Sequence, residues 1–274
     1  MDRLMNDHSF FNIFIHFFTQ EVTMKKYIKR ASIVFGSACL SAGIAFAGGG
    51  NAHWGYSGAE GPENWGHLSP DFEMCAKGKN QSPINITATI ESELSPISFS
   101  YSSSPLDVIN NGHTIKASMT PGSSITVDGH IYELKQIHWH TPSENHIDGR
   151  SFPMEAHFVH ADTEGNLAVI GIMYIKGRED ASIANIWNRM PVKTDGVSKD
   201  ADVTVNPMDM LPANRDYYRF NGSLTTPPCS EGVRWMVMKD PVEASAEQME
   251  KFHSSFHGDT NRPVQPVNAR PILQ

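Results

Sequence analysis

Three histidines in two neighbouring segments are the residues best suited to metal chemistry. His138 and His140 lie two positions apart, and His157 follows a segment, 141–153, that is rich in turn-forming residues. Successive side chains of an extended strand point to opposite faces, so His138 and His140 share one face. The turn residues allow the chain to return as an antiparallel neighbour that offers His157 as a third ligand. Three imidazoles without a thiolate favour zinc with an open fourth position, the arrangement of catalytic sites.

A His-x-His pair on a strand can also be two ordinary histidines, and alone it is a weak metal signal. Two further residues strengthen the metal interpretation. Gln136 and Glu155 each precede a candidate ligand by two positions and therefore share its strand face. Each can accept a hydrogen bond from the imidazole N–H that does not face the metal, so both are expected to orient the ligand histidines.

The elements that must position these residues are short alternating runs, which predict a mostly β fold. The expected strands are 106–109, 113–119, 124–127, 130–140, 155–160, 167–176, 217–221 and 233–239. The expected turns between them are Asp128-Gly129, Glu164-Gly165 and Asn221-Gly222. Two helices are expected, at 180–189 and at 245–256, where Ser245 can cap and Gln248 stands at the capping-box position. We therefore predict an α+β domain around a large, mainly antiparallel twisted β-sheet with a few short peripheral helices.

The first 47 residues are predicted to be an N-terminal extension and signal peptide, and residues 48–274 a single domain. Met24 begins a basic stretch, and an apolar segment at 31–46 leads to a small-x-small cleavage site at 45–47. Met24 is therefore expected to be the true translation start. The apolar segment is short for a membrane span, so the mature protein is expected to be periplasmic or secreted, with no stable membrane span.

Composition and cysteine content narrow the classes of function. The chain has 274 residues, of which 39% are hydrophobic and 19% charged, as in soluble globular proteins. A net charge of -8 and the lack of a Lys/Arg cluster in the mature part argue against nucleic-acid binding. Of three cysteines, Cys39 lies in the predicted signal peptide. Cys75 and Cys229 remain as an even pair, which in an oxidising compartment favours a disulfide over two buried free thiols.

Motifs spread over the mature chain closely resemble those of the alpha-class carbonic anhydrases, and specifically their secreted bacterial branch. They run in the family's order from Trp54-Gly55-Tyr56 onward: QSPIN at 81–85, NNGH at 110–113, QIHWH at 136–140, PSE at 142–144, EAHFVH at 155–160 and GSLTTPPCSEGVRW at 222–235. The resemblance implies that residues 48–274 form a carbonic anhydrase catalytic domain. Such an enzyme is a lyase that hydrates carbon dioxide reversibly to bicarbonate and a proton.

The resemblance also implies how the reaction is carried out. A zinc ion on His138, His140 and His157 would present a hydroxide that attacks carbon dioxide. Thr225 would accept a hydrogen bond from that hydroxide and donate its own proton to Glu144, whose ionised carboxylate can only accept.

The remaining implied roles concern proton transfer and substrate binding. His113 matches the proton-shuttle position, where imidazole titrates in the useful range, and Tyr56 and Asn111 match residues that order the water chain beside it. Thr226 would help to position bicarbonate. The residues implied as the apolar wall for carbon dioxide are Val159, Val169, Leu224, Val233 and Trp235.

One position departs from the family pattern, and two alternative functions remain open. Lys116 stands where Gln or Asn is frequent, and a cation there can lower the pKa of His113. The spacing of His138, His140 and Glu144 also satisfies the core of a cupin metal motif, although Tyr132 and Ser151 replace its flanking glycines. The second alternative is a carbonic-anhydrase-like binding protein without zinc, but such proteins lose a ligand histidine and this chain retains all three.

The expected partners are small molecules. They are carbon dioxide and bicarbonate as substrates, and anions or sulfonamides as inhibitors at the zinc. Activated esters are expected as side substrates, because a zinc hydroxide attacks accessible carbonyls. The sequence leaves the oligomeric state open between a monomer and a homodimer.

Overall fold

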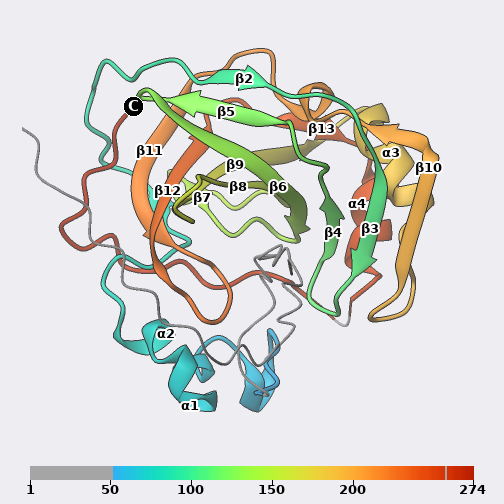
Figure 1. Cartoon of the computed structure of the whole chain (residues 1–274). Helices are drawn as coiled ribbons and strands as arrows, with labels where there is room; N and C mark the ends of the chain where they lie inside the picture. Colours follow the sequence, from blue (N-terminus) through green and yellow to red (C-terminus); the bar gives the residue numbers. More distant parts are fainter. Residues whose placement is uncertain (1–51, 257) are drawn as a thin grey trace, which may run out of the picture. The chain divides into compact units, whose positions relative to one another are not determined.

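One large twisted β-sheet carries the fold (Figure 1). The computed structural model describes residues 52–256 and 258–274, so the predicted signal peptide, its cleavage site and Met24 lie outside the described residues. Within the described residues, eleven strands form this sheet and two short strands form a second one. The main path runs β10-β3-β4-β6-β8-β9-β12-β11, with β5 also paired to β6, β2 to β5, and β13 to β9.

The strands have the following bounds. They are β1 (Asn85–Ile86), β2 (Ser98–Ser100), β3 (Ser104–Asn110), β4 (Ile115–Ser118), β5 (Ser124–Val127), β6 (His130–His140), β7 (His146–Ile147), β8 (Met154–Ala161), β9 (Leu167–Lys176), β10 (Val197–Val205), β11 (Tyr217–Ser223), β12 (Glu231–Met238) and β13 (Val242–Ala244). The helices are η1 (Gly58–Glu60), α1 (Trp65–Leu68), η2 (Pro70–Phe72), α2 (Met74–Lys77), α3 (Ala181–Asn188), η3 (Pro207–Met210) and α4 (Ala246–His253). The predicted mostly β fold with a few short helices is therefore confirmed.

The two faces of the sheet pack against different partners. Along β6, Ile137 and Trp139 point into the larger hydrophobic cluster, where Trp139 meets Trp187 of α3 edge-on with ring centroids 4.9 Å apart. Along β8, Phe158 joins the same cluster, whereas its neighbour Val159 joins the second cluster on the opposite face. Because strand side chains alternate, His138, His140 and His157 lie on the face of the second cluster.

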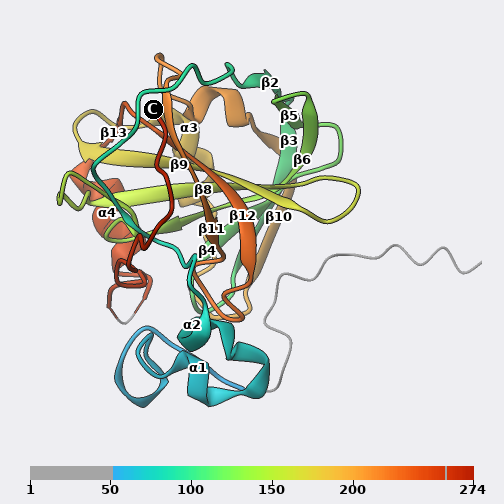
Figure 2. The same ribbon diagram turned by 90° about the vertical axis from the view of Figure 1, so that its left-hand side faces the viewer.

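The sheet is mixed rather than purely antiparallel. Strand β8 runs antiparallel to both of its neighbours, β6 and β9, but β9 pairs in parallel with both β12 and β13. Helices α1 and α2 lie together at one end of the molecule in two views at right angles (Figures 1 and 2). None of the helices in the described ranges is long and apolar enough to cross a membrane.

Most predicted elements are confirmed, and two predictions need correction. The turn at Asp128-Gly129 is present, with positive φ at both residues. Asn221-Gly222 is not a turn, because both residues lie inside β11. Gly222 is required there for space, since a Cβ atom on it would lie 2.1 Å from Ser82 Oγ. The sequence of residues 53–66, rich in Gly and aromatic residues with little periodicity, predicts irregular structure, yet these residues contain η1 and the beginning of α1.

Candidate metal centre

The three predicted ligand histidines meet at one point on the sheet. His138 on β6 lies directly opposite His157 on β8, and His140 follows two residues further along β6. One ligand nitrogen from each of the three lies within 4.8 Å of the others. Among the described residues, this is the group of His, Cys, Asp and Glu side chains spaced to hold a metal ion. The prediction that His138, His140 and His157 share one face of the sheet is therefore confirmed.

Each histidine has an acceptor close to the nitrogen that faces away from the other two rings. His138 Nδ1 lies 2.8 Å from Gln136 Oε1, and His157 Nε2 lies 3.0 Å from Glu155 Oε1, although off the line of a hydrogen bond. His140 Nδ1 lies 2.5 Å from the Thr260 carbonyl oxygen. A carbonyl can only accept, so Nδ1 of His140 carries the proton and Nε2 carries the lone pair. This Nε2 is buried without a hydrogen-bond partner, as expected for an atom that binds a metal.

The electrostatics keep two of these rings neutral. Burial lowers the pKa of His138 and of His140 well below the usual value, and the neighbouring histidines lower both pKa values further. Burial also acts to lower the pKa of His157, but Glu155 and Glu144 outweigh it and raise the pKa. Neutral imidazole is the form that binds metal, so the buried site favours the ligand state of His138 and His140. The donor set therefore fits zinc.

Buried carboxylates support the three rings. Glu155 accepts hydrogen bonds from the Glu144 and Asn145 N–H groups at 2.9 and 2.8 Å and from the Asn145 amide at 2.8 Å. Glu144 Oε1 accepts from the Arg262 N–H at 2.8 Å, while Oε2 lies 3.4 Å from His140 Nε2. Burial raises the pKa of Glu144 to about 7, against the lowering effects of His157, the Arg262 N–H and the nearby Thr225 hydroxyl. Glu144 Oε2 has no hydrogen-bond partner in the structure.

The residues predicted as an apolar wall gather on the same face as the histidines. Val159, Val169, Val233 and Trp235 are buried in the second cluster, with Leu224 packed against it. Val169 lies opposite Val159 on one side and Trp235 on the other. The Trp235 ring meets the His157 ring edge-on with centroids 4.8 Å apart. The apolar residues are therefore in direct contact with one of the three predicted metal ligands.

His113 lies in the turn between β3 and β4, stacked on Trp54 with ring centroids 3.7 Å apart. Asn111 Oδ1 accepts from the backbone N–H groups of His113 and Thr114, so this side chain shapes the turn that presents His113. Burial, followed by the charge of His53, lowers the pKa of His113 to about 4, against a smaller opposing effect of Asp195. The effect expected of Lys116 on this pKa is wrong, because Lys116 is paired with His138 across the sheet and lowers the pKa of His138 instead.

Tyr56 lies in the same aromatic group. Its ring meets those of Trp54 and His113 edge-on, with centroids 5.5 and 6.4 Å apart. The Tyr56 hydroxyl is buried without a partner, and burial followed by the charge of Glu144 raises its pKa well above the usual value. Tyr56 is therefore close to the His113 ring and near enough to Glu144 to feel its charge.

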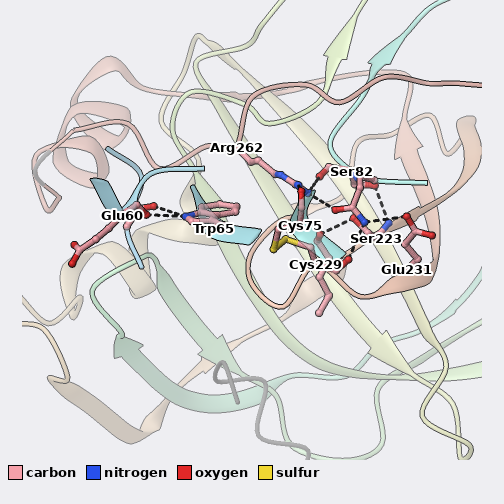
Figure 3. Close-up of a disulfide and its surroundings, with 11 residues drawn as sticks. Glu60, Trp65, Cys75, Ser82, Ser223, Cys229, Glu231 and Arg262 are labelled. Atoms are coloured by element: carbon pink, nitrogen blue, oxygen red, sulfur yellow. Dashed lines mark hydrogen bonds between the residues drawn. A yellow bond between two sulfur atoms is a disulfide. The ribbon is translucent and has the colours of Figure 1, made fainter. Parts of the chain in front are cut away.

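The expected disulfide is present and joins two distant segments. Cys75 in α2 is bonded to Cys229, 154 residues later, with Cα atoms 5.0 Å apart (Figure 3). The Cys229 N–H donates to the Thr226 carbonyl at 2.9 Å, in the turn that follows Thr225. The bond therefore links the loop of Thr225 and Thr226 covalently to α2.

A comparison with protein families decides the identity of the fold. The family described as "Eukaryotic-type carbonic anhydrase" matches residues 60–274. The chain belongs to the alpha carbonic anhydrase family. Membership excludes the cupin alternative, whose jelly roll is a different architecture.

Bacterial members of the alpha carbonic anhydrase family are similar over most of their length. A carbonic anhydrase of Pectobacterium carotovorum is 45% identical over 237 residues, which cover 86% of this chain and 95% of that protein. One of Neisseria gonorrhoeae is 45% identical over 248 residues, covering 90% and 97%. The alpha carbonic anhydrase of Thermovibrio ammonificans, solved in complex with the inhibitor sulfanilamide, is 50% identical with a TM-score of 0.80, covering 82% of this chain and all of that one.

Two site residues escaped the sequence analysis. Thr260 orients His140 through its carbonyl oxygen, and Arg262 holds Glu144 through its N–H. Thr260 and Arg262 make these contacts through main-chain atoms, which every residue type has, so the sequence gives no sign of them. Each residue also lies about 120 positions along the chain from its partner. The full burial of Arg262 was also not foreseeable from a loop without periodicity.

Proposed function

We propose that this chain hydrates carbon dioxide reversibly to bicarbonate and a proton at a zinc ion held by His138, His140 and His157. The observation that carries the proposal is the convergence of three imidazoles, those of His140 and His157 buried and that of His138 half-buried, each with an acceptor within 3.0 Å of its other nitrogen. As is established for carbonic anhydrases in general, zinc on three histidines brings the pKa of its bound water to about 7 and so supplies hydroxide at neutral pH.

Thr225 and Glu144 would aim the nucleophile. Glu144 Oε1 is occupied by the Arg262 N–H, which leaves Oε2 to accept from the Thr225 hydroxyl. A Thr225 hydroxyl that donates to Glu144 can accept only from the nucleophile, and so fixes the direction of its lone pair. Positioning of this kind matters because an error of 1 Å can cost about a hundredfold in rate.

The apolar wall and Thr226 would bind the substrate and product. Carbon dioxide has no charge or hydrogen-bond donor, so a surface of Val159, Val169, Val233, Leu224 and Trp235 next to His157 suits it. Thr226, in the loop fastened by Cys229, offers a hydroxyl that would help to position bicarbonate.

His113 would carry the product proton to solvent. Stacked on Trp54 it is a weak base, since its pKa is about 4. A ring that accepts a proton at neutral pH must leave this stack for a more solvated position, because burial is the main cause of the low pKa. Tyr56 would order the water between His113 and the metal, and Asn111 would present His113 on its turn.

The remaining expectations follow from the same proposal. Sulfonamides and anions would inhibit at the zinc, as sulfanilamide is an inhibitor of the Thermovibrio ammonificans enzyme, and activated esters would be side substrates. The disulfide fits a non-cytoplasmic protein, and we place the mature chain of residues 48–274 in the periplasm or outside the cell after removal of the segment that starts at Met24. A monomer or a homodimer is compatible with this site.

Metal analysis together with stopped-flow hydration of carbon dioxide tests the proposal. The wild-type protein should contain one zinc per chain and hydrate carbon dioxide, and His140→Ala should lose both properties. His130→Ala, which changes an exposed histidine on the same strand, is the matched control and should keep both. Full hydration activity in zinc-free protein, or no activity in zinc-loaded wild type, would contradict the proposal.

A further inference from the structure

Arg262 is a buried cation whose three hydrogen-bond partners are all neutral (Figure 3). Its side chain is among the largest that are fully buried. Nη1 donates to Gln81 Oε1 and to the Ser82 carbonyl, both at 2.8 Å, and Nη2 donates to the Cys75 carbonyl at 3.0 Å. The guanidinium also lies 5.7 Å from the centre of the Trp65 ring. The remaining donor, Nε, is buried without a hydrogen-bond partner. Burying a charge is costly, and more so when a donor is left unsatisfied, so this arrangement needs a reason beyond filling space.

The backbone around Arg262 touches two groups of the metal centre. The Thr260 carbonyl accepts from His140 Nδ1, and the Arg262 N–H donates to Glu144 Oε1. Neither contact depends on the residue type at its own position. Both depend on where the segment 260–262 lies. At one end of the segment, Thr260 exchanges two hydrogen bonds with Thr141, its N–H donating to the Thr141 carbonyl at 2.8 Å and its hydroxyl accepting from the Thr141 N–H at 3.1 Å. At the other end, the Arg262 guanidinium holds the segment, and this is the end that lies at Glu144.

Gln81 extends the connection to the other side of the site. Its amide oxygen accepts from Arg262, while its amide nitrogen donates to the Cys229 carbonyl at 3.0 Å and to Glu231 Oε1 at 3.1 Å. Cys229 closes the loop of Thr225. The Arg262–Gln81 pair therefore joins the segment that holds Glu144 to the loop that carries the hydroxyl proposed to bind it.

We infer that Arg262 is a positioning residue: its guanidinium fixes segment 260–262 against Cys75, Gln81 and Ser82, and thereby sets His140 and Glu144 in place. The inference rests on the proposed zinc site. It deepens that proposal, since it assigns a role in metal retention to a side chain that does not touch the metal ligands.

Arg270 supplies a matched control. It is also an arginine of the C-terminal segment that donates to three main-chain carbonyls, those of Asn221, Pro266 and Val267, at 2.9 to 3.0 Å. None of these three hydrogen bonds reaches Glu144, His140 or the disulfide. Arg262→Met and Arg270→Met therefore each remove a set of guanidinium hydrogen bonds to the main chain. Only the set of Arg262 holds a segment that contacts the proposed metal centre.

The test measures zinc release into an excess of the chelator dipicolinate, the visible spectrum of the cobalt-substituted protein, kcat/KM for carbon dioxide and Tm. Arg262→Met should release zinc about 10- to 100-fold faster than wild type, as loss of a group that orients a metal ligand does. Its cobalt spectrum should change, and kcat/KM should fall by at least about tenfold. Arg262→Lys keeps the charge but not the planar fork, so it should lie between Arg262→Met and wild type.

The outcomes separate the inference from the proposed function. Arg270→Met should lower Tm while zinc release and the cobalt spectrum stay as in wild type. Should Arg262→Met fail to fold, Arg262→Lys is compared with wild type on the same readouts. The inference is overturned if the Arg262 variants lose only Tm, as the control does. Wild type that neither retains zinc nor hydrates carbon dioxide would instead overturn the proposed function, and the inference with it.

Discussion

His160 should make the stability of this protein fall as the pH drops below neutrality. The side chain is fully buried in β8, where Nδ1 lies 3.1 Å from the Ala168 carbonyl and Nε2 lies 2.7 Å from the Tyr101 hydroxyl. A carbonyl can only accept, so Nδ1 carries the proton and Nε2 accepts from Tyr101. Both sites of the neutral ring are thus satisfied, whereas a second proton would place a charge in the core and reverse the hydrogen bond with Tyr101. Burial lowers the pKa of His160 to about 3.

The magnitude follows from proton linkage. The pKa of an unfolded histidine is about 6.5, so between about pH 3 and pH 6.5 the unfolded chain binds more protons at this residue than the folded chain does. The free energy of unfolding therefore falls as the pH falls through this window. The loss from His160 is about 2 kcal/mol at pH 5 and approaches about 5 kcal/mol below pH 3.

Urea denaturation of zinc-free protein at pH 7.5 and pH 5 measures this loss without a contribution from metal release. Other buried histidines also titrate, so the informative quantity is the difference between wild type and His160→Gln, which cannot gain a proton. The variant should be less stable at pH 7.5 but should lose about 2 kcal/mol less than wild type on going to pH 5. His130→Gln, at an exposed position, should lose as much as wild type. The reasoning fails if His160→Gln and wild type show the same pH dependence.

Three further predictions concern the disulfide and the proposed chemistry. Replacing Cys75 and Cys229 by Ser removes a bond that closes a loop of 154 residues. The free energy of unfolding should fall by about 2 to 5 kcal/mol and Tm by about 10 °C. Activity should also be lower, even while the protein remains folded. Both thiols free in non-reducing peptide mapping, or full activity and stability after reduction, would refute this. His113→Ala should slow turnover in weak buffer much more than it lowers kcat/KM, and imidazole should restore part of the loss; equal effects on both without rescue would exclude a relay. Thr225→Val should lower kcat/KM by about a hundredfold with the zinc content unchanged, and stopped-flow rates near wild type would show that Glu144 is not reached through Thr225.

The sequence predicted the elements whose pattern is local. β6 and β9 have the predicted bounds. Hydrophobic and polar residues alternate along most of β6, β9 is apolar over most of its length, and each strand is followed by turn-forming residues. The capping box of α4 was found for the same reason, since Ser245 and Gln248 are three residues apart. β10 was missed because it lies at one end of the sheet path, and most of its side chains are partly or fully exposed and polar.

The metal centre was predictable as far as side chains on adjacent strands define it. His138, His140 and Gln136 are fixed by strand alternation alone, and His157 by a turn that returns the chain. The acceptor of His140 could not be found in this way, because it is a carbonyl from a distant loop. The stack of His113 on Trp54 was missed as well, since no periodicity connects the two residues.

The position of β6 and β8 in the sheet bears on how the proposed metal ion would be acquired. β6 lies between β4 and β8, and β8 lies between β6 and β9, so both ligand strands are hydrogen-bonded on two sides. The groups that orient the three rings, Gln136, Glu155 and the Thr260 carbonyl, act on nitrogens that do not bind the ion. We therefore predict that folding does not require the proposed metal ion: the zinc-free polypeptide should reach the same fold and should bind the ion afterwards.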